Sequence, residues 1–173
     1  MATLQELSGI IVRCRKCPRL VRWREEVAKK PPPRYQGMDY WAKPLTGFGD
    51  PRARLLIVGL APAAHGGNRT GRIFTGDRSG DWLYETLHAF GFSNQASSMA
   101  RDDGLRLIGC YITAAVRCAP PGNKPSRVEF EKCRQQNTFT GKLTRKMFHE
   151  VFGKARDRLK APGNRHQAIG RSL

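Results

Sequence analysis

The sequence RLLIVGL at residues 54–60, followed by APAAHGGNRTGRIFTGDRSGDWLY at residues 61–84, determines the expected fold. The first part is a short, continuous apolar run bounded by turn residues, which is typical of a strand buried in a parallel sheet. The second part is a glycine-rich loop that leaves the carboxyl end of this strand. In open α/β sheets, ligands bind in the crevice at that position.

The segments around this strand predict an α/β layer fold, with a parallel sheet flanked by helices. Residues 4–28 have apolar positions at helical spacing but are interrupted by Pro18, which predicts one or two short helices. LRLIGCYITAAV at 105–116 predicts a second buried strand, and SRVE at 126–129 has the spacing of a capping box that opens a helix.

A further helix is expected in GDWLYETLHAF at residues 80–90. Ser79 is the expected N-cap, and Gly91 is the expected stop. The apolar face of this helix is predicted to consist of Trp82, Leu83, Leu87 and Phe90.

The long loop lacks the known phosphate-binding signatures, since it contains neither the Walker A sequence nor G-x-G-x-x-G. Its glycines allow main-chain N–H groups to approach a ligand closely, and Phe74 offers a face on which a flat ligand can stack. The pattern therefore predicts a planar heterocycle as the ligand.

The composition is strongly basic, with 31 Lys and Arg against 14 Asp and Glu, a net charge of +17 and a pI near 10.5. This excess favours a nucleic-acid partner over an ordinary solvated surface. No window of about 18 apolar residues occurs, and the N-terminus does not resemble a signal peptide. We therefore expect no membrane partner and a cytoplasmic location.

Four of the five cysteines form two pairs, Cys14 with Cys17 and Cys118 with Cys133. An odd number without a secretory signal argues against a disulfide framework and for one metal site built from the two pairs. Ligand chemistry alone leaves both zinc and an iron-sulfur cluster open. Cys110 lies in the apolar run LIGCYI and is expected in the core.

Five motifs in the sequence carry a family resemblance. They are GLAP at 59–62, HGGNRTGR at 65–72, FTGD at 74–77, AAVRCAPPGNKP at 114–125 and QNTFTG at 136–141. Together they resemble the family 5, or type b, uracil-DNA glycosylases of bacteria and archaea. The resemblance implies that the four paired cysteines hold a [4Fe-4S] cluster, and it selects iron-sulfur over zinc.

The same resemblance implies a DNA repair enzyme that hydrolyses the N-glycosidic bond of uracil, and of some other deaminated bases, after the nucleotide leaves the duplex. Ala61 stands where better-known uracil glycosylases have a water-activating Asp. Another carboxylate must then orient the water or stabilise the sugar cation, and we expect Asp77 in this role, with Asp81 as second candidate. The alternative role of Asp77 is a helix cap or a turn.

The expected substrate-binding residues are Gly59, Ala61, His65, Phe74, Ala114, Asn123 and Asn137. Phe74 would stack on the extruded base. Ala114 stands where family 4 enzymes have an Asn that reads uracil, so its replacement should loosen base discrimination. The expected phosphate contacts are Arg69, Arg72 and Lys124.

The chain departs from the family pattern after Cys133. The family has a further strand and helix there, leading to a His-x-Ser segment, and this segment is apparently missing between residues 134 and 135. The histidine that would donate to the departing base is missing with it, and neither His149 nor His166 stands in a matching context. We therefore expect one domain over residues 1–173 with an incomplete sheet.

Two other functions stay open on the sequence alone. The first is a catalytically impaired remnant that binds DNA and keeps its iron-sulfur cluster. The second is a zinc-ribbon-like nucleic-acid module, which would be colourless, whereas an iron-sulfur protein is brown.

Overall fold

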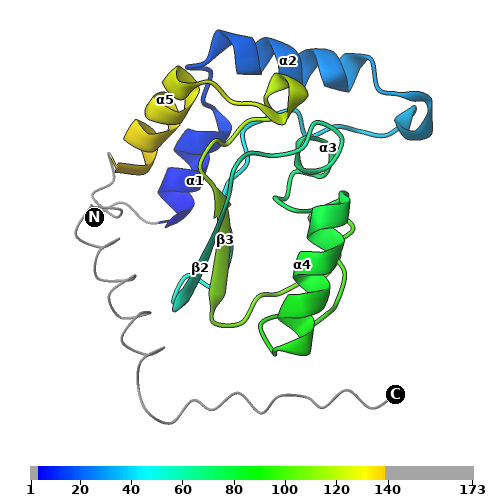
Figure 1. Ribbon diagram of the computed structural model, residues 1–173, viewed down its shortest axis with the longest axis vertical. Coiled ribbons are helices and arrows are strands. Elements are labelled where there is room, and N and C mark those ends of the chain that lie inside the picture. The colour runs from blue at the N-terminus through cyan, green and yellow to red at the C-terminus, as the bar shows by residue number, and fades with distance from the viewer. Residues whose placement is uncertain (1–3, 139–173) are drawn as a thin grey trace, which may run out of the picture. The chain divides into compact units, whose positions relative to one another are not determined.

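The computed structural model describes the backbone of residues 4–138 and the side chains of residues 4–133. The chain divides at Gln136 into two units, and the description below concerns the first. The single domain expected over residues 1–173 therefore stays a prediction. In chain order (Figure 1), the elements are α1 (Leu4–Val12), α2 (Pro18–Lys29), the 3-10 turn η1 (Pro33–Tyr35), β1 (Phe48–Gly49), β2 (Leu55–Gly59), α3 (Gly67–Thr70), α4 (Arg78–Ala89), β3 (Cys110–Ala114), the 3-10 turn η2 (Pro121–Asn123) and α5 (Arg127–Thr138).

The described strands form one sheet in the order β1-β3-β2. Strands β2 and β3 are parallel, with Gly59 opposite Ala114, as the two apolar runs predicted. Strand β1 pairs with β3 in the antiparallel direction, so the expectation of a purely parallel sheet is wrong. The sequence could not reveal β1, because a two-residue strand is too short for any apolar pattern.

Helix α4 lies along one side of the sheet (Figure 1), and its Tyr84 and Leu87 pack in one core with Ile112 of β3. The predicted apolar face of this helix is partly wrong, because Trp82 is 64% exposed and Phe90 is 75% exposed. The buried face instead consists of Gly80, Tyr84 and Leu87, which follow one another at spacings of four and three residues. The helix ends before Gly91, whose φ of 76° is the left-handed conformation predicted for the stop.

The two parallel strands differ in burial. In β3, Cys110, Ile112 and Ala114 are buried, which makes it the central strand. In β2, Leu56 is 41% exposed and Val58 is 48% exposed, so the prediction that this strand is buried is wrong within the described residues. We call Leu56, Val58 and the following Leu60, which alternate along the chain and are all exposed, the open face of β2.

Helices α1, α2 and α5 lie towards the end of the sheet where β2 and β3 finish (Figure 1). Pro18 is the first residue of α2, where its missing N–H costs no hydrogen bond. The predicted capping box opens α5: the Ser126 N–H donates to Glu129 Oε2 at 2.7 Å, and the Glu129 N–H donates to Ser126 Oγ at 3.3 Å. Among the described helices, none has the length and apolar character needed to cross a bilayer.

Candidate functional site: a cysteine-lined cavity and a glycine-lined recess

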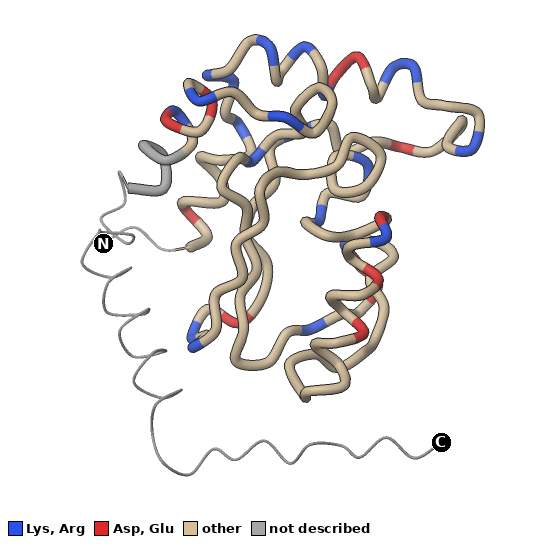
Figure 2. The backbone as a smooth tube through the Cα atoms, in the orientation of Figure 1, with Lys and Arg blue, Asp and Glu red and all other residues tan. Residues whose placement is uncertain are grey.

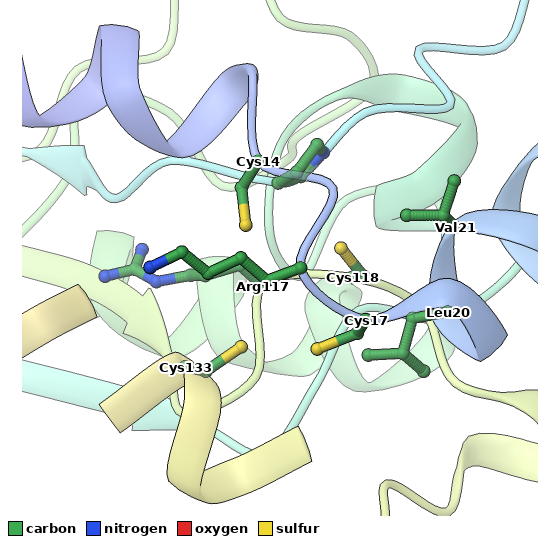
Figure 3. A pocket seen from close by; sticks show the side chains of 9 residues that line it. Cys14, Cys17, Leu20, Val21, Arg117, Cys118 and Cys133 are labelled. Atoms are coloured by element: carbon green, nitrogen blue, oxygen red, sulfur yellow. The ribbon is translucent and has the colours of Figure 1, made fainter. Parts of the chain in front are cut away.

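Four cysteines from three parts of the chain line one small cavity, together with Leu20, Val21, Pro44 and Arg117 (Figure 3). Cys14 follows α1, and Cys17 precedes the first residue of α2. Cys118 lies after β3, and Cys133 lies on α5. The structure therefore brings together the two pairs that the sequence predicted as one site, although 100 residues separate Cys17 from Cys118 in the sequence.

The thiols in this cavity are poorly hydrated and close enough to influence one another. Burial raises the pKa of Cys118 to about 12, and it also raises the pKa of Cys17 and Cys133. Charge on neighbouring cysteines of the set raises these pKa values further. A bound cation would reverse this penalty, because metal ligation requires the thiolate form.

The spacing of these side chains bears on which metal group they could hold. Within residues 4–133, no three His, Cys, Asp or Glu side chains lie close enough together to hold a single metal ion.

Cys110 lies away from this cavity. It is fully buried in the core of the sheet with Ile112 and Leu87, and its Sγ lies 3.6 Å from the main-chain oxygen of Phe92. The expectation that Cys110 is a core residue is therefore confirmed.

A glycine-rich turn follows the carboxyl end of β2. A Cβ built on Gly59 would lie 2.9 Å from the ring of Phe74, so only glycine lets that ring approach the end of the strand. Phe74 itself has a φ of 54°, which is unusual for a residue with a side chain. Gly80 makes this turn possible, because a Cβ there would collide with the Phe74 main-chain oxygen at 1.8 Å.

Asp77 lies three residues after Phe74 and is the N-cap of α4, where Oδ1 accepts a hydrogen bond from the Gly80 N–H at 3.0 Å. The prediction of Ser79 as N-cap is wrong, because the helix begins two residues earlier, at Arg78, with Asp77 as its N-cap. The Oδ2 atom would lie 2.7 Å from a Cβ on Gly66, so Gly66 makes room for this carboxylate. The capping role foreseen as the alternative for Asp77 is thus present, and it engages Oδ1. Asp81 is exposed in the first turn of α4.

His65 is held by aromatic and cationic groups from the segment after α2. Tyr40 Oη lies 2.8 Å from His65 Nδ1, and the Tyr35 ring stacks on the imidazole with ring centres 5.5 Å apart. Burial lowers the pKa of His65, and the positive charges of Arg34 and Arg69 lower it further. The imidazole is therefore neutral at pH 7.

The other predicted site residues are spread over several parts of the fold. Ala114 is buried at the end of β3, next to Gly59. Ala61 packs against the core that contains Cys17 and Cys118. Asn123 is exposed, with a φ of 56°, in the turn η2. The side chain of Asn137, like those of His149 and His166, lies outside the described residues.

One expected phosphate contact is wrong. Arg72 is only 4% exposed and is committed to the protein interior, where it forms an ion pair with Asp103 at 2.8 Å. It also donates to Ser98 Oγ and to the Arg101 main-chain oxygen. Such a buried guanidinium cannot reach a phosphate. Arg69 and Lys124 remain predictions, and Lys124 is exposed.

The charges are unevenly distributed along the backbone (Figure 2). Strands β2 and β3 contain no charged residue, whereas α2 contains Arg19, Arg22, Arg24 and Lys29. Basic residues also follow at Lys30 and Arg34, in the segment between α2 and β1 (residues 30–47), which we call the arm. Among the described residues, basic side chains thus lie on α2 and on the arm rather than along β2 and β3, although α2 also contains the acidic Glu25 and Glu26.

Comparison with known proteins assigns the family. Residues 46–150 match the family model described as the Uracil DNA glycosylase superfamily, which is more than half of the chain. The chain therefore belongs to this superfamily. It is 59% identical over 120 residues to the type-5 uracil-DNA glycosylase of Thermus thermophilus, covering 69% of this chain and 54% of that protein.

Other relatives agree with this assignment. The chain is 55% identical over 131 residues to the type-5 enzyme of Mycobacterium leprae, covering 76% of this chain and 57% of that protein. It is 31% identical over 131 residues to the type-4 enzyme of Pyrobaculum aerophilum, covering 75% of this chain and 50% of that protein. The resemblance to family 5 is confirmed, and the chain spans about half the length of the curated relatives that it matches.

Sequence reasoning did not single out two groups of side chains that the structure brings to the sites. Arg24 contacts Cys118 across 94 residues of sequence, and no local pattern could have revealed this contact. Tyr35 and Tyr40, in the proline-rich segment between α2 and β1, surround His65. The one available signal was the presence of two tyrosines in a proline-rich stretch, where aromatic residues must find a partner.

Proposed function

We propose that the chain is a DNA glycosylase that hydrolyses the N-glycosidic bond of uracil, and of other deaminated bases, in DNA. The observation that carries the proposal is the contact between Gly59 and Phe74, beside Ala114, with the carboxylate of Asp77 in the same turn. This combination offers a flat aromatic face and an anion within one short segment. Relatives named uracil-DNA glycosylases, at 55% to 59% identity, support it.

The turn after β2 is suited to a base that has left the duplex. Such a base can stack on the Phe74 ring, which the absence of a side chain at Gly59 allows to lie against the end of the strand. Ala114 brings no hydrogen-bonding group to the base edge, so a wrong edge leaves no protein group unpaired. The proposal therefore includes a range of deaminated bases rather than uracil alone.

The reaction breaks the bond between the sugar C1′ and the base nitrogen, and the electron pair of that bond leaves with the base. Water then adds to C1′, and its proton passes to solvent or to the departing base, which leaves an abasic sugar and a free base. Asp77 Oδ2 stabilises the positive charge that develops on the sugar or orients the water, while Oδ1 stays bound to the Gly80 N–H. Asp81, in the first turn of the same helix, is the second candidate.

The arm after α2 supplies groups for the DNA backbone. The guanidinium groups of Arg34 and Arg69 lie 4.6 Å and 4.7 Å from the centre of the Tyr35 ring, and neither forms a salt bridge within the described side chains. Both can therefore bind a phosphate. If the Tyr40 hydroxyl donates to Nδ1, His65 is left with a neutral N–H donor at Nε2 for the base or a phosphate. Lys124, Asn123 and Asn137 complete the proposed contacts.

We also propose that Cys14, Cys17, Cys118 and Cys133 hold a [4Fe-4S] cluster. The gathering of four cysteines around one cavity and the family membership support this proposal. When bound, the cluster supplies folding energy, because it ties the N-terminal helices to the segment after β3 and to α5. The catalytic steps proposed above involve only the protein's own residues.

A uracil-release assay on a labelled duplex oligonucleotide tests the proposed activity. The cluster-loaded chain should form abasic sites, and Asp77→Asn should reduce the rate by about 100-fold to 10,000-fold. Asparagine also caps helices well, so the variant should fold normally. Asp81→Asn is the matched control, with a smaller expected loss.

The second candidate function is the impaired remnant, which the segment apparently missing between residues 134 and 135 favours. In that case the chain binds DNA with strong dependence on salt, but neither it nor Asp77→Asn forms abasic sites. A native chain that is loaded, binds DNA and shows no turnover would overturn the proposed glycosylase.

A further inference from the structure

Arg24 is a buried cation next to the proposed cluster ligands. It lies on α2 and is only 2% exposed. Its Nη1 donates a hydrogen bond to Cys118 Sγ at 2.9 Å, and its Nη2 donates to the Cys14 main-chain oxygen at 3.4 Å. One guanidinium group therefore contacts two of the four cysteine-bearing positions from opposite ends of the sequence.

No carboxylate forms a salt bridge with Arg24 among the side chains of residues 4–133. The salt bridges there join Arg15 to Glu25, Arg19 to Glu129 and Arg72 to Asp103. The pKa of Glu25 is lowered mainly by its hydrogen bond to Arg15, and the charge of Arg24 lowers it further, so Glu25 compensates Arg24 only from a distance. The Nε of Arg24 is also buried without a hydrogen-bond partner. Burying a cation without a direct ion pair is unfavourable, so an anion close to the guanidinium would stabilise the arrangement. The cysteine-lined cavity is the place for it.

We propose that Arg24 compensates the charge of a [4Fe-4S] cluster held by the four cysteines and positions its Cys118 ligand. This inference rests on the proposed cofactor. A cluster with four thiolate ligands carries net negative charge, and both hydrogen bonds to its sulfurs and nearby charge set its reduction potential. Reduction adds a further negative charge, so a buried cation at this position favours the reduced form and slows loss of the metal.

The main chain of Arg24 has a separate role, which makes the side chain a clean target. Its carbonyl oxygen accepts a hydrogen bond from Asn68 Nδ2 at 3.2 Å, and Asn68 is 1% exposed in the short helix α3. A side-chain substitution keeps this link between α2 and the glycine-rich loop. Arg22, two residues earlier on the same helix, is exposed and serves as the matched control for loss of one positive charge.

The experiment compares Arg24→Met, Arg24→Lys and Arg22→Met as full-length, cluster-loaded proteins. Two quantities are measured: the rate at which iron passes to a chelator, and the reduction potential by spectroelectrochemistry. Arg24→Met should release iron about 10- to 100-fold faster than the native chain, with a more negative potential. Arg24→Lys keeps the charge and should hold the potential nearer the native value, and Arg22→Met should match the native chain in both.

Loaded Arg24→Met and Arg22→Met proteins with the same release rate and potential would overturn the role of Arg24 alone. A native chain purified with zinc or without iron would overturn the proposed cofactor together with this role. If Arg24→Met cannot be loaded, Arg24→Gln replaces it, since glutamine can still donate to Cys118 but carries no charge. A more negative potential in Arg24→Gln than in Arg22→Met supports charge compensation, and equal potentials overturn it.

Discussion

Within the described part of the chain, the cysteine-lined cavity contains all the side chains predicted for it, whereas the open face of β2 has no element that covers it. The cavity has all four predicted ligands, and Cys17, Cys118 and Cys133 are buried there. The open face of β2 consists of large apolar side chains that are 41% to 54% exposed. From this contrast we expect stability at the cavity to depend on the proposed cluster, whereas the open face of β2 adds little until something covers it.

The largest expected effect comes from removing one cavity cysteine. Cys118→Ser should abolish the visible absorbance and the cooperative unfolding transition, because the metal group supplies much of the folding energy at this end. Circular dichroism melting and the absorption spectrum measure both. Cys110→Ser is the control, since Cys110 lies in the other core, and it should keep the colour. Loss of colour in both variants would break the distinction between the cysteines.

The next effect compares the two parallel strands directly. Ile112→Ala in β3 should reduce the free energy of unfolding by about 2 to 5 kcal/mol, because Ile112 is fully buried. Val58→Ala in β2 should change it by only about 0.5 kcal/mol, since Val58 is 48% exposed. Urea unfolding of the loaded chain measures both. Equal losses would mean that β2 is covered in solution.

The free energy of unfolding should depend on pH through the ion pair of Asp103 with Arg72. Burial alone would raise the pKa of Asp103, but hydrogen bonds from Arg72 and from three main-chain N–H groups outweigh it and lower the pKa to about 2. A carboxylate with a lowered pKa stabilises the fold above its unfolded pKa near 3.8. This contribution, about 2 kcal/mol, should be lost as the pH falls from about 4 to about 2.

Urea unfolding between about pH 5 and about pH 2 follows this loss, and Asp103→Asn removes the same dependence on pH. An unchanged slope in the variant would show that other carboxyl groups control acid unfolding.

The smallest effect on stability is expected from placing a charge on the open face of β2. Val58→Lys should leave the free energy of unfolding within about 0.5 kcal/mol of the native value. It should nevertheless reduce self-association, because exposed apolar edge strands promote pairing between chains and a lysine opposes it. Light scattering at several protein concentrations measures the change. A strong loss of stability would indicate that Val58 is buried in solution.

The sequence revealed those parts of the fold that are governed by local rules. Strands β2 and β3, the stop at Gly91 and the capping box of Ser126 and Glu129 all follow from short patterns. The prediction that β2 is buried was wrong because an apolar run indicates that a strand favours burial but does not show which element covers it. Ser79 was predicted as the N-cap, and Asp77 only as an alternative, because these two residues offer competing caps within three positions.

The candidate sites were foreseen in their residue types but not in their contacts. The cysteine set was predicted from spacing and resemblance, and the structure brings its members to one cavity. The burial of Arg72 and the contact of Arg24 with Cys118 depend on long-range packing, which one sequence does not encode in a local pattern. The same holds for Tyr40, whose hydroxyl meets His65 only after the arm folds back.

The most direct test of the central claim, that the four paired cysteines form one cluster site, is the iron and acid-labile sulfide content of the anaerobically purified chain. The account predicts a brown protein with about four irons and about four sulfides per chain, unchanged in Cys110→Ser. A colourless protein that contains one zinc ion per chain, or no metal at all, would contradict it.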